Sequence, residues 1–465
     1  MTSVPSRRPR LNGNDEDAAA RCRPMQQVSY KDSGFDELSA RLNRQGELPT
    51  DVLEIVRGVI DSVRTQGDEA VQAFTARFDD VDLPPAQWEI SREECKAAGR
   101  LVSPEFRRAA RATLSNVKAF ARLGRRKSWS RVVRPGVRLG EKFDPIGRVG
   151  VYVPGGTAPL ASTVLMTVPF AKVAGVREVI VCTPPGAGGS VAPEVLYALY
   201  LTGADRVFRV GGAQAIAAMG LGTPTIPAVD KIVGPGNAYV TAAKQLMVGR
   251  VAIDLLAGPS ELLVLADSTA RADWVAADLL AQAEHGSGHE EVVLLTTSKK
   301  LIQQVQAEVD RQVESLSRRN YIAKVLERGT WLVHVRSMEQ AIEMANRFAP
   351  EHVQVHAANA RKVAAAVTTA GAIYIGGYSP VPLGDFTAGP SHVLPTGGAG
   401  KSFSGLTVDQ FQRKTSMVEY TQTALEREGP VVEEFGRVEG LDAHACSVTI
   451  RTGSTQGKRR QGRHE

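Results

Sequence analysis

Val149-Gly150-Val151-Tyr152-Val153-Pro154-Gly155-Gly156 is a short apolar run that passes directly into a glycine turn, and a helical pattern begins after it at Ala161. The run is rich in β-branched residues and has the length of a buried strand. The same order of strand, glycine turn and helix recurs with strands at 178–182, 206–210 and 231–233. Such units build a doubly wound, mostly parallel sheet, so the sequence predicts an α/β fold.

The glycine turns leave two interpretations open. Glycine lets a phosphate approach the backbone, and the following helix offers free N–H groups, which favours nucleotide binding. However, neither the Gly-x-Gly-x-x-Gly pattern nor a phosphate loop ending in Lys-Ser/Thr follows these strands, so the turns could be tight connections only. If a dinucleotide binds, the polar or stacking side chains best placed at the strand ends are Tyr152, Gln214 and Asn237.

A second stretch contains candidate functional side chains. It is Ala281-Gln282-Ala283-Glu284-His285-Gly286-Ser287-Gly288-His289-Glu290, which ends a helical run and precedes a strand from 291. Gln282 and His285 are three residues apart and share one helix face, while Gly286 is suited to a left-handed cap. Because the glycines interrupt the helix, His289 cannot share a metal site with His285 as in an unbroken helical zinc motif, and we expect it at the surface. A metal site and a polar helix end are both compatible with this stretch.

Further along, Glu351 and His352 stand at the junction between a helix ended by Pro350 and a strand at 353–355. An adjacent carboxylate and imidazole could share acid–base work, or could belong to an edge strand. The glycine-rich stretch 371–404 contains Asp385 and His392 and is typical of a loop shaped around a ligand.

The remaining chain is predicted to be largely helical. Helical spacing covers 35–78, 104–123 and most of 301–350, and the chain is expected to turn helical again after Gln412. A strand is expected at 447–451, before a basic tail.

Composition excludes several classes of protein. The chain has 465 residues, enough for two to four domains, and contains no apolar run of membrane-spanning length and no secretory signal pattern. Its four cysteines are isolated, so we expect a reducing cytoplasm without disulfides. Residues 1–23 and 456–465 contribute +2 and +3 to the net charge of +6, which leaves a nearly neutral body and argues against nucleic-acid binding. The basic run 122–134 is interpreted as a solvated face or loop.

Eight blocks of sequence, in one order along the chain, resemble those of histidinol dehydrogenases, and the resemblance covers roughly residues 30–452. They are Gly-Val-Tyr-Val-Pro-Gly-Gly (150–156), Gly-Gly-Ala-Gln-Ala-Ile-Ala-Ala (211–218), Val-Asp-Lys-Ile-Val-Gly-Pro-Gly-Asn (229–237), Ala-Gly-Pro-Ser-Glu (257–261), Gln-Ala-Glu-His-Gly (282–286), Pro-Glu-His (350–352), Gly-Asp (384–385) and Ser-His-Val-Leu-Pro-Thr (391–396).

The resemblance implies a zinc enzyme that oxidises L-histidinol to L-histidine with two NAD, through bound histidinal. It implies that Glu351 and His352 are the acid–base pair, and that Tyr152, Gln214 and Asn237 contact NAD. The implied zinc ligands are Gln282, His285, Asp385 and His444. The implied substrate-binding residues are Ser260, Gln282, His285, Glu351, Asp385, His392, Glu439 and His444.

The same resemblance implies an aldehyde-dehydrogenase-like α/β fold with two incomplete Rossmann-type domains, in a homodimer whose C-terminal segment carries Glu439 and His444 to the partner chain. We expect a disordered arm at 1–27, an N-terminal segment at 28–148, an NAD-binding domain at 149–257, a zinc-carrying and catalytic part at 258–405, a dimer-crossing segment at 406–452 and a disordered tail at 453–465. No thiol nucleophile is needed, so Cys95 and Cys182 are interpreted as structural.

Three other functions would share part of these sequence features. A paralogue of the same fold could oxidise another polar alcohol such as a sulfonated diol, but it would be expected to differ at substrate-side positions that match here. A catalytically silent nucleotide- or zinc-binding protein would not need the Glu351–His352 pair. A nucleic-acid partner could bind only through the basic tails, and would be recognised by salt-dependent binding that is lost on tail deletion.

Overall fold

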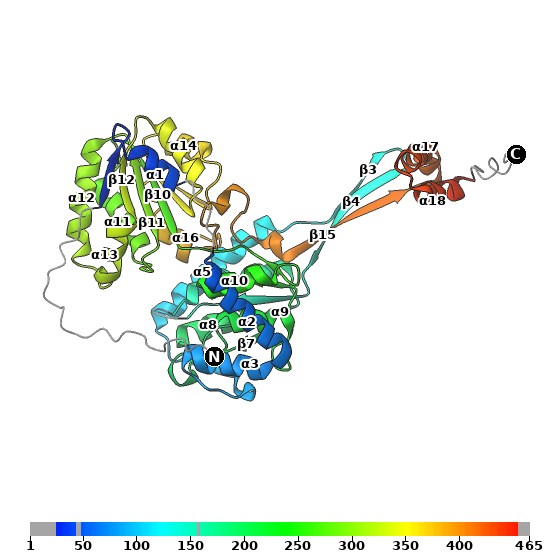
Figure 1. The fold of residues 1–465 in the computed structure, drawn as a ribbon, viewed down its shortest axis with the longest axis horizontal. Helices are drawn as coiled ribbons and strands as arrows, with labels where there is room; N and C mark the ends of the chain where they lie inside the picture. Colours follow the sequence, from blue (N-terminus) through cyan, green and yellow to red (C-terminus); the bar gives the residue numbers. More distant parts are fainter. Residues whose placement is uncertain (1–24, 43–47, 156–158, 454–465) are drawn as a thin grey trace.

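The computed structural model describes residues 25–42, 48–155 and 159–453. Two six-stranded sheets, here called sheet A and sheet B, form two α/β layers side by side, and a long three-stranded arm projects from them (Figure 1). Within the described part of the chain, no helix combines the length and the apolar character needed to cross a membrane.

Sheet A has the strand order β1-β12-β11-β10-β13-β14, and all its neighbouring strands are parallel. Its strands are β1 (Gln26–Ser29), β10 (Glu261–Ala266), β11 (Glu291–Thr296), β12 (Thr330–His334), β13 (His352–His356) and β14 (Ala372–Ile375). One face packs against α11 (Ala272–Ala283), α12 (Lys299–Val313) and α13 (Arg319–Arg328), and the other against α1 (Phe35–Arg41), α14 (Met338–Phe348) and α15 (Ala360–Ala366). Because both faces are covered, the central strands are apolar on both sides.

Sheet B has the order β2-β7-β6-β5-β8-β9, in which only the β2–β7 pair is antiparallel among the described strands. Its strands are β2 (Glu89–Ile90), β5 (Arg148–Tyr152), β6 (Glu178–Cys182), β7 (Arg206–Phe208), β8 (Lys231–Val233) and β9 (Ala252–Ile253). One face is covered by α2 (Thr50–Gln66), α3 (Asp68–Asp79), α9 (Gly212–Leu221) and α10 (Ala238–Met247). The other is covered by α4 (Arg92–Ala98), α5 (Pro104–Gly124), α6 (Ala161–Leu165), α7 (Val168–Ala174) and α8 (Pro193–Thr202). The predicted α/β class with two Rossmann-type sheets is confirmed.

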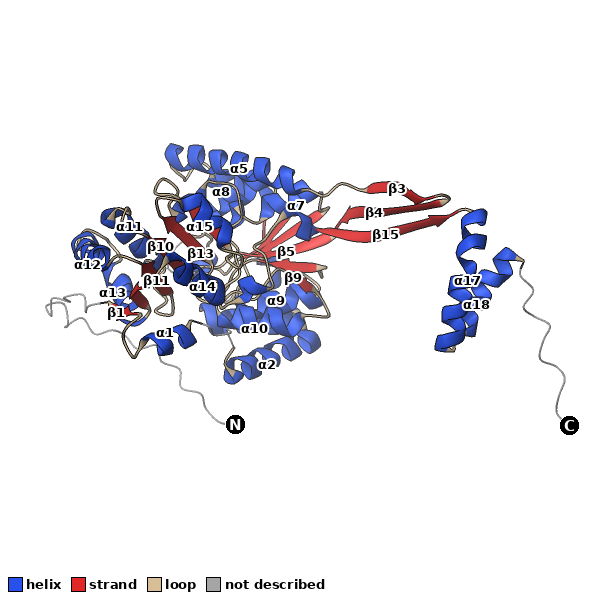
Figure 2. Ribbon diagram, turned by 90° about the horizontal axis from the view of Figure 1, so that it is seen from above, coloured by secondary structure: helices blue, strands red, loops and turns tan. Residues whose placement is uncertain are grey.

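The arm consists of the antiparallel strands β3 (Trp129–Arg134), β4 (Val137–Pro145) and β15 (Gln412–Tyr420). It ends in two helices, α17 (Gln422–Glu439) and α18 (Asp442–Thr452), which pack against each other where Gly436 meets Ala445. Figure 2 shows these helices far from both sheets. Short helices at Val381–Phe386 (α16), Pro85–Gln87, Ala187–Gly189, Ala399–Lys401 and Val408–Phe411 complete the fold.

Four local predictions need correction. The strand expected at 447–451 is part of helix α18, because packing on α17 overrides the β-propensity of its residues. The segment after Gln412 is strand β15 up to Tyr420, since it pairs with β4 along its whole length. The mainly helical stretch 301–350 also contains strand β12. Met25 is buried and Gln26 and Gln27 pair with β12, so the end of the expected disordered arm is ordered.

The parts of the predicted disordered tails at 1–24 and 454–465 lie outside the described residues.

Candidate active site

Glu351 and His352 lie at the amino end of sheet A, where β13 begins beside the first residues of β10. The backbone N–H of Glu261 donates to Glu351 Oε2 at 3.0 Å, and the backbone N–H of Glu351 donates to Glu261 Oε2 at 3.3 Å. Glu261 Oε1 accepts a third hydrogen bond, 2.9 Å long, from the N–H of Gly397. This reciprocal pair of buried carboxylates fixes the starts of two neighbouring strands relative to each other.

The imidazole of His352 has a defined orientation. Its Nδ1 lies 3.1 Å from the carbonyl oxygen of Glu261, so Nδ1 carries the proton and donates it there. Nε2 is buried and has no hydrogen-bond partner among the described residues, and Asp385 Oδ1 lies 3.8 Å from it, beyond hydrogen-bond distance. Nε2 is therefore a free proton acceptor.

Burial changes the protonation of this pair in opposite directions. It lowers the pKa of His352 to about 3, so the imidazole is neutral near pH 7. It raises the pKa of Glu351 well above its usual range, and the neighbouring Glu261 and Asp385 raise it further, while the Ser260 hydroxyl acts in the other direction by hydrogen bonding to the carboxylate. A carboxyl with a raised pKa and a neutral imidazole are the groups that acid–base chemistry requires.

Three of the four predicted metal ligands lie near this pair. Gln282 is in the last turn of α11, His285 follows the helix end, and Asp385 is on α16. The pKa of Asp385 is raised to about 6 by burial, and the nearby His285 opposes this shift. As the sequence predicted, Gly286 has a left-handed backbone with φ of +70° and His289 is exposed.

The donor atoms of these side chains suit a metal ion. The side chain of Gln282 is buried, yet its amide oxygen and nitrogen lack hydrogen-bond partners within the described structure. Unpaired buried amide atoms are costly unless a ligand satisfies them. His285 Nδ1 lies 3.2 Å from the Gln282 carbonyl oxygen, an arrangement that turns Nε2 outward as in metal-binding histidines. No cluster of three or more His, Cys, Asp or Glu side chains suited to a metal occurs in the described chain.

Two expected substrate contacts lie in the same place. Ser260 directly precedes β10 and hydrogen bonds to Glu351. His392 hydrogen bonds with the backbone of Asp385, and burial lowers its pKa to about 4. Its Nε2 is buried without a partner in the described residues. His392 is thus a neutral imidazole near pH 7, and it lies close enough to His352 to influence the pKa of that residue.

Glu439 and His444 are not brought to this site within one chain. Glu439 ends α17, and His444 lies in the first turns of α18, so both are at the tip of the arm (Figures 1 and 2). Both residues are exposed there.

The expected NAD contacts lie at the carboxyl end of sheet B. Tyr152 ends β5, and its hydroxyl accepts a 3.1 Å hydrogen bond from the N–H of Gly212 at the start of α9. Gln214 is completely buried in α9, and both its amide atoms lack partners among the described residues. Asn237 is exposed and caps α10 by accepting from the N–H groups of Tyr239 and Val240. Strand ends of this kind are where nucleotides bind in α/β folds.

Sequence reasoning missed three residues of the site. Glu261 lies in the block Ala-Gly-Pro-Ser-Glu (257–261), but the sequence predicted no role in the site for it. Tyr374 on β14 lies with its ring centre 6.0 Å from that of His352. A Cβ on Gly384 would stand 2.0 Å from the Tyr374 hydroxyl, so glycine is needed next to Asp385. Only the three-dimensional arrangement of the strands brings these residues together.

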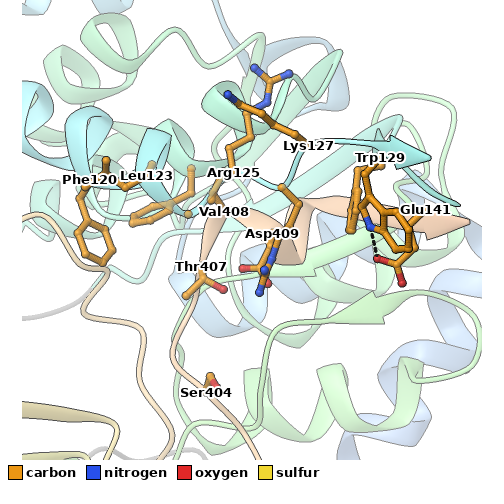
Figure 3. A pocket seen from close by; sticks show the side chains of 15 residues that line it. Phe120, Leu123, Arg125, Lys127, Trp129, Glu141, Ser404, Thr407, Val408 and Asp409 are labelled. Atoms are coloured by element: carbon orange, nitrogen blue, oxygen red, sulfur yellow. Dashed lines mark hydrogen bonds between the residues drawn. The ribbon is translucent and has the colours of Figure 1, made fainter. Parts of the chain in front are cut away.

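A hollow of about 710 Å³ lies elsewhere, at the base of the arm, between the end of α5 and the start of β3 (Figure 3). Its side chains include Leu123, Arg125, Lys127 and Trp129, whose indole N–H donates to Glu141. The described residues that line it do not include any predicted catalytic, metal or NAD residue. The chemistry described above therefore lies outside this hollow.

Comparison with known proteins gives one consistent result. Residues 42–452 match the family model described as histidinol dehydrogenase. A histidinol dehydrogenase of Xanthomonas campestris is 44% identical over 406 residues, 87% of this chain and 93% of that protein. One from Methanosarcina mazei is 43% identical over 419 residues, 90% and 96% of the two chains. The crystal structure of histidinol dehydrogenase from Elizabethkingia anophelis has a TM-score of 0.88 at 36% identity and covers 92% of this chain and 98% of that one.

Proposed function

This chain belongs to the histidinol dehydrogenase family of NAD-dependent dehydrogenases, and we propose that it converts L-histidinol to L-histidine through L-histidinal, reducing two NAD per substrate. The family's reaction is the oxidation of histidinol in histidine biosynthesis. The observation that carries the two-step proposal is the buried, neutral His352 with a free Nε2 beside Glu351, whose pKa is raised.

In the first oxidation, His352 Nε2 would accept the proton of the substrate hydroxyl, and NAD, when bound, would supply the acceptor for the hydride that leaves the carbon atom. Since Nδ1 donates to the Glu261 carbonyl oxygen, that hydrogen bond strengthens as the ring becomes positively charged. Because the pKa of His352 is low, the protonated imidazole loses its proton readily and becomes a neutral base again.

In the second oxidation, Glu351 removes a proton from the water that attacks the aldehyde carbon, which gives a hydrate. The hydrate would then lose a proton and give a second hydride to a second NAD, and so become the carboxylic acid. A carboxylate with a raised pKa is a stronger base than an ordinary one, so burial of Glu351 serves this step. The proposed chemistry needs no thiol nucleophile. Cys95 and Cys182 are buried in α4 and β6, and burial raises the pKa of the Cys95 thiol to about 11.

Zinc fits the remaining donors. Gln282, His285 and Asp385 would hold it together with His444 of a partner subunit, a mixed nitrogen and oxygen set that suits this ion. When bound, zinc would hold the imidazole and amine of the substrate and so orient its alcohol carbon. The unpartnered amide of Gln282 supports this assignment.

The assembly we propose is a homodimer in which the arm of each chain reaches the site of the other. The exposed position of Glu439 and His444 at the arm tip supports this arrangement. Ser260, His392 and the partner's Glu439 would bind substrate, with the metal ligands and Glu351. NAD would contact Tyr152, Gln214 and Asn237. A reducing cytoplasm is the proposed compartment, consistent with free thiols at Cys95, Cys182 and Cys446.

The test is the amount of NADH formed per L-histidinol consumed, before and after treatment with a zinc chelator. We expect two NADH per substrate, lost on chelation and restored by zinc. One NADH would mean that the aldehyde is released, which would contradict the role of Glu351. Turnover of a different polar alcohol in place of histidinol would instead favour a paralogue, and NAD or zinc binding without turnover would favour a silent binding protein.

A further inference from the structure

One face of β13 carries an unusual line of polar side chains. His352, Gln354 and His356 alternate with Val353 and Val355 along the strand, and all five residues are buried. The two valines pack among α14 and α15, so the three polar residues face α11. The neighbouring strand β10 places Leu262, Val264 and Ala266 beside them, so this polar line crosses an otherwise apolar face.

Helix α11 lies opposite this polar line. Three of its residues, Trp274, Asp278 and Gln282, are spaced four apart and share one helix face. Asp278 is buried and accepts a 2.8 Å hydrogen bond from His356 Nε2. Trp274 packs on Gly377, where a Cβ would stand 2.3 Å from the indole ring. Gln282, one turn beyond Asp278, carries the unpartnered amide described above.

The pair formed by Asp278 and His356 is not needed for any step derived so far. A buried polar pair is costly to desolvate, and an apolar pair of similar size often stabilises a fold at least as well. Its hydrogen bond, however, fixes the position of α11 along β13, and one helical turn separates it from Gln282. A metal ligand must be held within about 0.5 Å of its productive position.

We propose that Asp278 and His356 are positioning residues that hold α11 against β13 and thereby place Gln282 for metal binding. This inference rests on the metal set proposed above. Neither side chain touches the metal; the effect passes through one turn of helix. Loss of the pair should therefore weaken metal binding as the loss of other outer partners of metal ligands does, by roughly 10–100-fold.

The experiment measures zinc affinity of the full-length protein by competition with a chromogenic chelator, without substrate. We expect Asp278→Ala to weaken zinc binding by ~10–100-fold and Asp278→Asn, which keeps an acceptor for His356, to weaken it less. The matched control is Val309→Ala in α12, a fully buried residue of the same apolar core that belongs to neither β13 nor α11. It should lower the melting temperature and leave zinc affinity unchanged.

Gln282→Ala tests the proposed metal ligands separately from the positioning role of Asp278 and His356. If it weakens zinc binding and Asp278→Ala does not, the positioning inference is wrong and the metal set stands. If neither Gln282→Ala nor Asp278→Ala weakens zinc binding, the metal set itself is wrong. Should Asp278→Ala fail to fold, Asp278→Asn and His356→Gln carry the same comparison, and equal zinc affinity in both and in the wild type would overturn the inference.

Discussion

The amino end of sheet A and the tip of the arm carry residues assigned to one site, but they are built in opposite ways. Around β13 the polar side chains are buried and held by backbone hydrogen bonds, as with Glu351 and His352. At the tip, Glu439 and His444 are exposed, and so are the apolar side chains of Phe435, Val438 and Ile450. Exposed apolar groups gathered on two small helices are typical of a surface that another chain covers. In the proposed dimer, one chain would form the reactive part of the site and the arm of its partner would supply the rest.

The largest effect should come from the buried region. His352→Asn and Glu351→Gln each remove a proton acceptor, and general acid–base groups contribute roughly 10²–10⁴-fold to rate. With histidinol as substrate, kcat should fall by that order in both variants. With histidinal as substrate, Glu351→Gln should remain strongly impaired. Zinc content and melting temperature serve as controls for folding, and a fall in kcat of less than about threefold in His352→Asn would remove it from the acid–base role.

Mixing two inactive variants tests directly whether the two regions act in one site. His352→Asn changes the buried part of the site and leaves His444 on the arm intact. His444→Ala changes the arm and leaves His352 intact. After subunit exchange, a mixed dimer contains one site with both parts intact, so statistical mixing should restore about a quarter of wild-type activity.

Mass spectrometry of the mixed dimers can demonstrate that subunits have exchanged. If they have exchanged and activity still does not recover, His444 does not act across subunits. As a control, mixing His352→Asn with Glu351→Gln places both defects in the core and should restore nothing.

Gln214 in α9, at the carboxyl end of sheet B, should give a smaller effect, on cofactor binding alone. Gln214→Met keeps the side-chain length and removes the buried amide, so we expect the KM for NAD to rise about tenfold, as for one or two lost hydrogen bonds. The KM for histidinol should not change, and stability should rise slightly because an unsatisfied buried amide is gone. Asn237→Ala is a poorer probe, since Asn237 also caps α10 and its loss costs about 1 kcal/mol of stability. An unchanged KM for NAD in Gln214→Met would place the cofactor elsewhere.

The sequence could predict what is local. Glycine turns after apolar runs predicted sheet B, whereas the second α/β sheet was expected only from the family resemblance, and the spacing of Gln282, His285 and Gly286 predicted the helix end that the structure shows. It could not predict the arm, because β15 is a strand only through pairing with β4, whose paired residues lie 267 to 283 positions earlier in the chain. For the same reason Glu261 was missed: its partner Glu351 is 90 residues away, and no local pattern marks the hydrogen bonds that join them.

The smallest effect concerns a carboxyl outside both regions, which tests whether burial alone raises a pKa in this protein. Asp79 ends α3, and burial, with a smaller contribution from Asp80, raises its pKa from 3.8 to about 6. Between these two pH values the folded chain holds more protons at Asp79 than the unfolded chain, so this residue makes the free energy of unfolding fall as pH rises. Asp79→Asn should remove that dependence. Because Asp79 is partly exposed, we expect a gain of only about 1 kcal/mol near pH 7 and little change near pH 3.5. Urea unfolding at the two pH values measures the difference, and an equal effect of the substitution at both would show that the pKa of Asp79 is ordinary, which would weaken the argument from burial at Glu351 as well.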